Sequence, residues 1–386
     1  MAGTLDYLRW RGDLTFNRDH FNSVDASLFA SFSYLPFDHS VIGHTLGEIC
    51  KQLLKITDEN RAITGLERTE ALLMPQSPRY KDVKVLDWVS ELEDDPEPIQ
   101  FDAGVFRIDD NTIVVAFRGT DDTMTGWSED MVMNYTPVIT GQKLAAKYLE
   151  TVGDIFPDDK IFVTGHSKGG NYAHYAIANV NSDLQSRIIR SYSFDGPGYR
   201  HQIYGTDAFQ NAMPKMKTYL PENSIIGAML DHPERTLIVK CTRPMLDQHD
   251  PRKWSVGRNS FVLAKGLSTA ARIVRHSLIH FNHTIPAKKR EQMWSALFDA
   301  FGNLDVTSVH QISGIPGTYK FGRAYLALDS EMRSVFRAIF SSIISTASHN
   351  INLPFTSNDD PYKDYPQSND SDKAPIFFEA YDITQE

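Results

Sequence analysis

A serine flanked by glycines is the residue of this sequence best placed to do chemistry. The stretch GHSKG at 165–169 matches the pattern G-x-S-x-G, which puts a serine in a tight turn between a strand and a helix, with its hydroxyl exposed. Residues 161–163 are apolar and predict the strand, and residues 171–179 predict the helix. This context favours Ser167 as a nucleophile over the alternative, a glycine-rich connection with no catalytic role.

A serine nucleophile needs a general base, because its hydroxyl is barely ionised at neutral pH. A histidine in a loop after a strand can supply that base, and His249 follows the apolar run RTLIVKCT at 235–242. His232 stands too close to the preceding segment for this role. Three further histidines lie in or beside helical sequence: His276, His280 and His283. We therefore expect His249 to be the base.

Three carboxylates are candidates for the acid that orients the histidine. Asp195 follows the run IIRSYSF and precedes a Gly-Pro-Gly turn, so its side chain is expected at the carboxyl edge of the sheet, where such sites assemble. Asp231 and Glu222 are alternatives, because the acid of many such folds follows the next strand. A structural role in capping the turn is a further alternative for Asp195. We favour Asp195 as the acid.

Two N–H groups are expected to stabilise the oxyanion that forms when the serine attacks a carbonyl carbon. One belongs to Lys168, at the start of the helix after the serine. The other is assigned to Thr120 in the run VVAFRGTDD, whose hydroxyl is a further donor; otherwise Thr120 is an ordinary turn residue. The Lys168 side chain is expected either to be solvated or to meet an anionic group of a substrate.

The elements that must hold these residues alternate along the chain as in an α/β fold. From about 100 to 265, short apolar runs alternate with helical patterns, which predicts a mainly parallel sheet covered on both faces. Residues 24–56 and 265–348 are expected to form flanking helices, so one α/β domain is predicted over 1–348. Residues 349–386 are acidic and are expected to form a flexible tail.

Composition narrows the classes of function. The 386-residue chain has 41% hydrophobic and 23% charged residues, and its net charge of −10 argues against a nucleic-acid partner. Cys50 and Cys241 form no CxxC pair, and the first residues lack the apolar run of a signal peptide, so a cytoplasmic protein is expected. The two histidines of HFNH at 280–283 have no carboxylate partner segment, and no dinucleotide or phosphate motif is complete. Neither a metal nor a cofactor is expected.

Several segments resemble known families. AFRGT, Trp127 and Asp130 in GWSED, and VTGHSKGG together resemble the class 3 lipases, in which the first of these segments carries an oxyanion donor. SYSFDGPG resembles the pancreatic-type lipases, in which an aspartate at this place is the triad acid. Further segments, in the same order over about 24–345, resemble a bacterial family of lipase-like α/β-hydrolases of unknown function: SFSYLPF, GTDDTMTGWSEDMVM, GHSKGGNYA, FDGPGY, SIIGAMLDH, QHDPRKW and TIPAKKREQMWSALF.

The resemblance implies an α/β-hydrolase fold with a catalytic set at these positions: Ser167, His249, Asp195 and Thr120. The chain departs from the class 3 lipases in two places. Those lipases carry an aspartate after the next strand, where this chain has Asn223 and Ser224 in PENSIIG. They also carry a leucine after the nucleophile, where this chain has Lys168. The first departure leaves the identity of the acid open.

Together these patterns predict a serine hydrolase, lipase-like or esterase-like, that cleaves a carboxylic ester through an acyl-enzyme. The resemblance implies a small-molecule or lipid ester as substrate and a transient contact with a membrane or lipid surface; the oligomeric state stays open. Two alternatives remain. One is an acyltransferase or thioesterase with the same catalytic groups, and the other is a non-catalytic hydrolase fold that binds lipid or protein.

Overall fold

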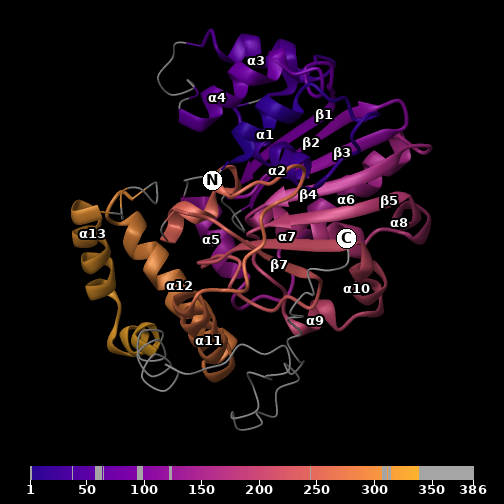
Figure 1. Ribbon diagram of the computed structural model, residues 1–386. Coiled ribbons are helices and arrows are strands. Elements are labelled where there is room, and N and C mark those ends of the chain that lie inside the picture. The colour runs from indigo at the N-terminus through magenta and orange to yellow at the C-terminus, as the bar shows by residue number, and fades with distance from the viewer. Residues whose placement is uncertain are drawn as a thin grey trace.

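A seven-stranded, mostly parallel sheet forms the centre of the protein (Figure 1). The computed structural model describes residues 2–36, 38–56, 63, 65–93, 99–120, 124–243, 245–306, 311 and 314–338. In spatial order the strands are β1 (Lys84–Glu93), β2 (Ile99–Asp109), β3 (Thr112–Phe117), β4 (Lys160–His166), β5 (Ile188–Phe194), β6 (Met216–Pro221) and β7 (Thr236–Val239). The pairs β1–β2 and β2–β3 are antiparallel, and all pairs from β3 to β7 are parallel.

Helices cover both faces of this sheet and form a separate group at one side of the molecule, drawn in orange and yellow in Figure 1. The helices before the sheet are α1 (Thr4–Arg11), α2 (Ser23–Phe32), α3 (Leu46–Leu53) and α4 (Gly65–Leu73). Those between the strands are α5 (Met124–Val132), α6 (Thr140–Ile155), α7 (Lys168–Ala178), α8 (Ser182–Arg187), α9 (His201–Tyr204) and α10 (Asp207–Ala212). The separate group holds α11 (Thr269–Thr284), α12 (Ala287–Gly302) and α13 (Gly314–Ala327). Short 3₁₀ helices are η1 (His39–Val41), η2 (Met74–Gln76), η3 (Met213–Lys215), η4 (Met245–His249) and η5 (Pro251–Lys253).

The strands are continuous apolar runs because both of their faces are buried. Val114 and Ala116 of β3 belong to the core that the sheet forms with α1, α2 and α3. Ile113, Val115 and Phe117 belong to the core on the opposite face, which includes side chains of α6 and α7. Successive side chains of a strand point to opposite faces, so one short run supplies both cores. The predicted α/β-hydrolase fold, with a mainly parallel sheet covered on both faces, is confirmed.

The antiparallel hairpin of β1 and β2 was not distinguished by the sequence analysis. Lys84, Asp87, Ser90 and Glu91 interrupt the apolar pattern of β1, because this strand lies at the edge of the sheet. The sequence patterns for β3 to β7 do match the strands that the structure contains. The expected tail at 349–386 lies outside the described residues.

The third hydrophobic core is built mainly from helical segments after the sheet. Phe281 of α11, Met293 and Leu297 of α12, and Ala324 of α13 are buried together there. Its helices contact the rest of the protein through α12, which packs against α5, and through Arg275 of α11, which donates to the Leu230 carbonyl oxygen at 3.1 Å. In the part of the chain that the structure describes, no helix combines the length and the apolar character needed to span a membrane.

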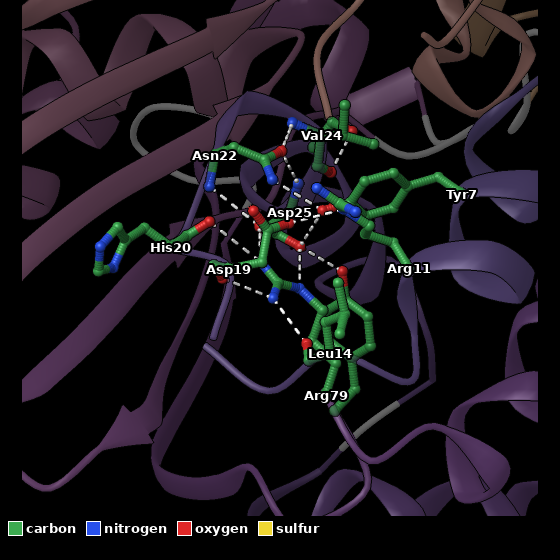
Figure 2. Close-up of polar contacts among 11 residues, drawn as sticks. Tyr7, Arg11, Leu14, Asp19, His20, Asn22, Val24, Asp25 and Arg79 are labelled. Carbon is green, nitrogen blue, oxygen red and sulfur yellow. Dashed lines mark hydrogen bonds and ion pairs between the residues drawn. The ribbon is translucent and has the colours of Figure 1, made fainter. Parts of the chain in front are cut away.

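A buried ion pair joins the N-terminal helices to the segment before β1 (Figure 2). The Asp25 and Arg79 side chains are both fully buried, and Arg79 Nε donates to Asp25 Oδ1 at 2.8 Å while Nη2 donates to Oδ2. Arg79 Nη1 donates to the carbonyl oxygens of Leu14 and Asp19, each at 2.8 Å. Tyr7 also donates to Asp25 Oδ1, at 3.0 Å. These bonds hold α1, α2 and the loop between them to the segment before β1, which is distant in the sequence.

Removing one member of this pair should destabilise the protein strongly. Arg79→Met leaves the Asp25 carboxylate buried without its counter-charge, which should lower the free energy of unfolding by about 3–5 kcal/mol. Urea denaturation followed by circular dichroism measures that change. The matched control is Arg9→Met, because Arg9 forms an exposed ion pair with Asp6, with side-chain exposures of 54% and 42%. This substitution should lower the free energy of unfolding by less than about 1 kcal/mol. Equal effects of the two substitutions would contradict this account.

Candidate active site

Five successive parallel strands each deliver one polar residue to the same edge of the sheet. Thr120 follows β3, Ser167 follows β4, Asp195 follows β5, Ser224 follows β6 and His249 follows β7. All five strands run in the same direction, so these residues leave the sheet at its carboxyl edge. The order of the strands thus brings together side chains from across more than a hundred residues of sequence.

Ser167 occupies a strained turn between β4 and α7. Its φ of 56° is positive and its ψ is −133°, a conformation that residues with a side chain rarely adopt. A Cβ atom on Gly165 would lie 2.1 Å from the carbonyl oxygen of Gly169, and one on Gly169 would lie 2.2 Å from that of Phe117. Glycine is therefore required on both sides of the serine. The strand, turn and helix have the arrangement that the G-x-S-x-G pattern predicts.

The Asp195 carboxylate is hydrogen-bonded to the imidazole of His249. Asp195 Oδ2 lies 2.7 Å from His249 Nδ1, and the Asp195 side chain is 2% exposed whereas that of His249 is 27% exposed. Asp195 has a positive φ of 49°, and its backbone N–H donates to the Tyr219 carbonyl of β6 at 2.8 Å. The aspartate is thus held rigidly, while the imidazole can be reached from solvent.

Ser224 completes the hydrogen bonding of the Asp195 carboxylate. Its hydroxyl donates to Asp195 Oδ1, the carboxylate oxygen that His249 does not use. Ser224 lies in the PENSIIG segment, after the strand that carries an aspartate in the class 3 lipases. At this edge of the sheet the carboxylate therefore comes from β5, and the residue after β6 supplies a hydroxyl to it. The sequence analysis had noted Ser224 only as a departure.

The two alternative acids lie in other surroundings. Asp231 accepts a hydrogen bond from Tyr204 at 3.2 Å, pairs through its backbone with Tyr199, and lies 3.9 Å from Arg275. Glu222 uses its backbone N–H and carbonyl to join β7 and the start of α11. The ring nitrogen of His249 that an acid would orient is bonded to Asp195.

The other histidines that the sequence analysis weighed have structural partners or lie on α11. His232 Nδ1 is 2.8 Å from Glu234, and its Nε2 is 2.7 Å from the Gly227 carbonyl oxygen. His276, His280 and His283 are residues of α11. Among the described residues, no three or more His, Cys, Asp or Glu side chains are grouped so that they could hold a metal ion.

The loop after β3 passes directly beside the nucleophile. A Cβ atom on Gly119 would lie 2.8 Å from the Cβ of Ser167, so Gly119 and Thr120 run against the turn. The Thr120 hydroxyl donates to Asp130 Oδ2 of α5 at 2.6 Å. A hydroxyl has one proton to donate, and the Thr120 hydroxyl gives it to Asp130. This hydroxyl therefore does not supply the further hydrogen bond that was expected for the oxyanion. Burial raises the pKa of Asp130 to about 6, although Lys168 and the Thr120 hydroxyl lower it.

Both roles expected of the Lys168 side chain are wrong. The side chain is completely buried, and its ammonium group donates to Glu129 Oε2 on α5. Glu129 also accepts from the Tyr172 hydroxyl at 2.7 Å and from the Gln100 N–H at 3.1 Å. A buried lysine needs a counter-ion. The two adjacent acids of the GWSED segment were the feature of the sequence that could have indicated this pairing. The pair joins α5 to the residue that follows the nucleophile.

Tyr34 and His166 are further site residues that sequence reasoning missed. His166 Nε2 lies 2.6 Å from the carbonyl oxygen of His249, and His166 Nδ1 lies 2.9 Å from the Tyr34 hydroxyl. A carbonyl oxygen only accepts, so Nε2 carries the proton and Nδ1 accepts from Tyr34. Burial and the neighbouring His249 hold the pKa of His166 well below its usual range. This neutral ring stands 4.4 Å from the ring of His249, centre to centre, and ties the base to the turn that carries Ser167.

The buried Lys168–Glu129 pair generates a prediction about stability. Glu129→Gln or Lys168→Met alone should each lower the free energy of unfolding by about 3 kcal/mol or more, because each leaves one charge buried and unpaired. The double variant should recover most of the loss, since glutamine keeps an oxygen for Tyr172 and no charge is left. Urea denaturation of the four proteins measures the coupling, and simple additivity of the two losses would contradict it.

The sequence was compared with protein-family models, curated proteins and solved structures. No curated protein matches it. Solved structures that resemble it include a fungal lipase bound to an inhibitor, with 18% identity, 55% of this chain and 77% of the other chain covered, and a TM-score of 0.36. Rhizomucor miehei lipase with its propeptide is 17% identical, with 64% of this chain and 75% of the other chain covered and a TM-score of 0.34. Lipase II from Rhizopus niveus is 16% identical, with 55% of this chain and 84% of the other chain covered and a TM-score of 0.34.

These values describe a distant likeness, and the fold assignment rests on the order and direction of the strands. The chain also matches a family model. The model of the Mbeg1-like family covers residues 74–299, which is more than half of the chain and includes every residue from the β1 edge of the sheet to α12. The chain belongs to the Mbeg1-like family.

Proposed function

We propose that the protein is a serine hydrolase that cleaves a carboxylic ester through an acyl-enzyme. The observation that carries the proposal is the bond from Asp195 to His249, whose ring lies against His166, the residue directly before the strained Ser167. A nucleophile displayed at a turn, a base beside it and an acid behind the base are the parts that acyl transfer to serine requires.

The proposed reaction begins with Ser167. His249 Nε2 takes the hydroxyl proton as Ser167 Oγ bonds to the carbonyl carbon of the ester. Asp195 holds the proton on Nδ1, which leaves Nε2 free to act as base, and stabilises the positive imidazolium that results. The backbone N–H groups of Lys168 and Thr120 are assigned to the oxyanion. The alcohol leaves with the proton from His249, and water then releases the acid by the same steps.

Hydrolysis is favoured over acyl transfer by the exposure of the base. The His249 side chain is 27% exposed, so water can reach the imidazole that would activate it. An acyltransferase would have to keep water out at this point, whereas a thioesterase uses water as an esterase does. We also propose a lipid ester as substrate and a transient contact with a membrane, from the likeness of motifs, and a cytoplasmic location, from two buried, free cysteines.

Loss of the nucleophile or the base should abolish turnover without unfolding the protein. Ser167→Ala and His249→Ala should each lower kcat for p-nitrophenyl butyrate by about 10⁴-fold or more, because triad members act as a unit. Ser167→Ala should also lose labelling by a fluorophosphonate probe. His44→Ala is the matched control, since His44 is 49% exposed and far from these residues in sequence. A folded wild-type protein that neither turns over esters nor takes up the probe would favour a non-catalytic binding protein.

The choice of acid can be tested by comparing two aspartates. Asp195→Asn should lower kcat by about 10⁴-fold, because an amide at this position favours the wrong tautomer of the imidazole. Asp231→Asn should leave kcat nearly unchanged, since Asp231 interacts with Tyr204 and Arg275 instead. Steady-state kinetics of both variants make the comparison, and a larger loss for Asp231→Asn would remove Asp195 from the proposed triad.

A further inference from the structure

A second histidine–carboxylate pair is buried in the protein, apart from His249 and Asp195. His232 Nδ1 is 2.8 Å from Glu234 Oε1, and the two side chains are 1% and 0% exposed. The Thr218 hydroxyl of β6 also donates to Glu234 Oε1. These three side chains take no part in the proposed reaction, so their presence in the core calls for another reason.

The partners of His232 determine where its ring protons lie. Its Nε2 is 2.7 Å from the Gly227 carbonyl oxygen, which only accepts, so Nε2 carries a proton. Its Nδ1 faces the Glu234 carboxylate, which accepts when it is ionised, so Nδ1 carries a proton as well. Burial raises the pKa of the Glu234 carboxyl, but the neighbouring His232 and the Thr218 hydroxyl help to lower it, to about 2. The pair is therefore an imidazolium bonded to a carboxylate.

The hydrogen bonds around Glu234 all run toward its carboxylate. His174 of α7 lies between two hydroxyls, 2.8 Å from Ser191 and 3.2 Å from Thr218. The Thr218 hydroxyl gives its one proton to Glu234, so it accepts from His174 Nε2, and His174 Nδ1 accepts from Ser191. Burial lowers the pKa of His174 to about 4, in agreement with this neutral ring. The imidazolium of His232 is thus the counter-charge of Glu234.

The charged ring of His232 holds the segment that lies against the proposed acid. A Cβ atom on Gly227 would lie 2.6 Å from Asp195 Oδ1 and 2.9 Å from Ser224 Oγ, so the Gly227 backbone approaches both groups closely. A hydrogen bond from an ionised donor is about twice as strong as a neutral one. The bond from His232 to the Gly227 carbonyl oxygen therefore keeps this segment firmly in place beside the acid.

The orientation of the acid depends on the place of this segment. Asp195 Oδ1 accepts from Ser224, and Asp195 Oδ2 is bonded to His249. A shift of the segment at 224–227 would move the Ser224 hydroxyl and let the carboxylate turn away from the imidazole. Misplacement of a catalytic group by about 1 Å can lower a rate by about 100-fold.

We propose that His232 and Glu234 form a charged pair that positions the acid, acting through Gly227 and Ser224 on the Asp195 carboxylate. Both are positioning residues, because they are buried and act through other groups rather than on the substrate. The inference rests on the proposed function, since it requires Asp195 to be the acid. It goes beyond that function by giving a catalytic purpose to buried charges outside the triad.

The charge of the pair can be measured by nitrogen-15 NMR of protein labelled at histidine. At about pH 8, where an exposed imidazole is neutral, the wild-type protein should show one histidine with protons on both ring nitrogens. His232→Gln should remove that signal. In Glu234→Gln the ring should keep only the Nε2 proton, because the new amide can donate to Nδ1. A wild-type His232 with a single ring proton would overturn the proposal, whether or not esters are turned over.

Two double variants test the positioning role without leaving a buried charge unpaired. Both contain Glu234→Gln, because loss of His232 alone would leave the Glu234 carboxylate without its counter-charge. With His232→Gln an N–H stays available for the Gly227 carbonyl oxygen, and kcat for p-nitrophenyl butyrate should fall by less than about 3-fold. With His232→Leu that donor is lost, and kcat should fall by about 10-fold or more while KM changes by less than about 2-fold.

Gly227→Ala is an independent variant, because it keeps the charged pair and places a Cβ atom against Asp195 Oδ1. It should also lower kcat by about 10-fold or more. The matched control for the loss of a buried imidazole is His174→Gln. His174 is 1% exposed and bonds to Ser191 and Thr218, so its replacement should change kcat by less than about 2-fold.

Rates are expressed per active site, counted by complete labelling with the fluorophosphonate probe, so a variant that is only less stable keeps its kcat. The proposal is overturned if the two double variants have the same kcat, if Gly227→Ala has the wild-type kcat, or if the losses lie in KM. Failure of the proposed function gives a different result. In that case no ester is turned over and no Ser167-dependent labelling occurs, and the positioning role falls with it although the NMR signal of the charged pair remains.

Discussion

The arrangement at the carboxyl edge of the sheet depends on a steric constraint at Ser167. Its backbone adopts a positive φ, and the chain around it is so close that glycine alone fits at 165 and 169. This contact brings β4, α7 and the end of β3 together at one point, where Gly119 also approaches the serine. A rigid display of the hydroxyl follows, and the strain is sustained because buried strands on both sides hold the turn.

Helix α5 connects the two residues assigned to the oxyanion. Adjacent acids on this helix contact different partners, since Glu129 holds the ammonium group of Lys168 and Asp130 accepts from the Thr120 hydroxyl. Each contact fixes a residue whose backbone N–H is proposed to face the substrate. The substitution of lysine for a leucine after the nucleophile is thus compensated within the same helix that holds the other oxyanion residue. The same rule applies at Asp25 and Arg79, where a buried charge is again matched by its counter-charge.

His249 is held by two hydrogen bonds and stays accessible to solvent. Asp195 bonds to one ring nitrogen of His249, and neutral His166 donates to its backbone carbonyl. The next residue back, Gln248, accepts from the indole N–H of buried Trp254 at 2.6 Å. The imidazole also borders a cavity of about 230 Å³ and is 27% exposed, so solvent and small ligands can reach it.

The sequence by itself determined the class of fold and the turn that carries Ser167, because both depend on local patterns. Short apolar runs with glycine-containing ends are sufficient to predict buried parallel strands, and the glycines around Ser167 are sufficient to predict its turn. The place of His249 at this edge of the sheet was predictable for a related reason, since it follows a strand whose neighbours were already recognisable. The hairpin of β1 and β2 was not, because charged residues at an edge strand interrupt the pattern.

Only the tertiary structure decided which groups meet. Asp195, Asp231 and Glu222 all follow apolar runs, and sequence order does not reveal which carboxylate faces His249; that depends on how neighbouring strands align. Lys168 is paired with Glu129 of α5, and Asp195 with Ser224 in the loop after β6. His166 is bonded to Tyr34 in the turn after α2, and none of these partners is near in sequence. Burial of a charge or a ring nitrogen makes a partner necessary, but packing in three dimensions selects which residue that partner is.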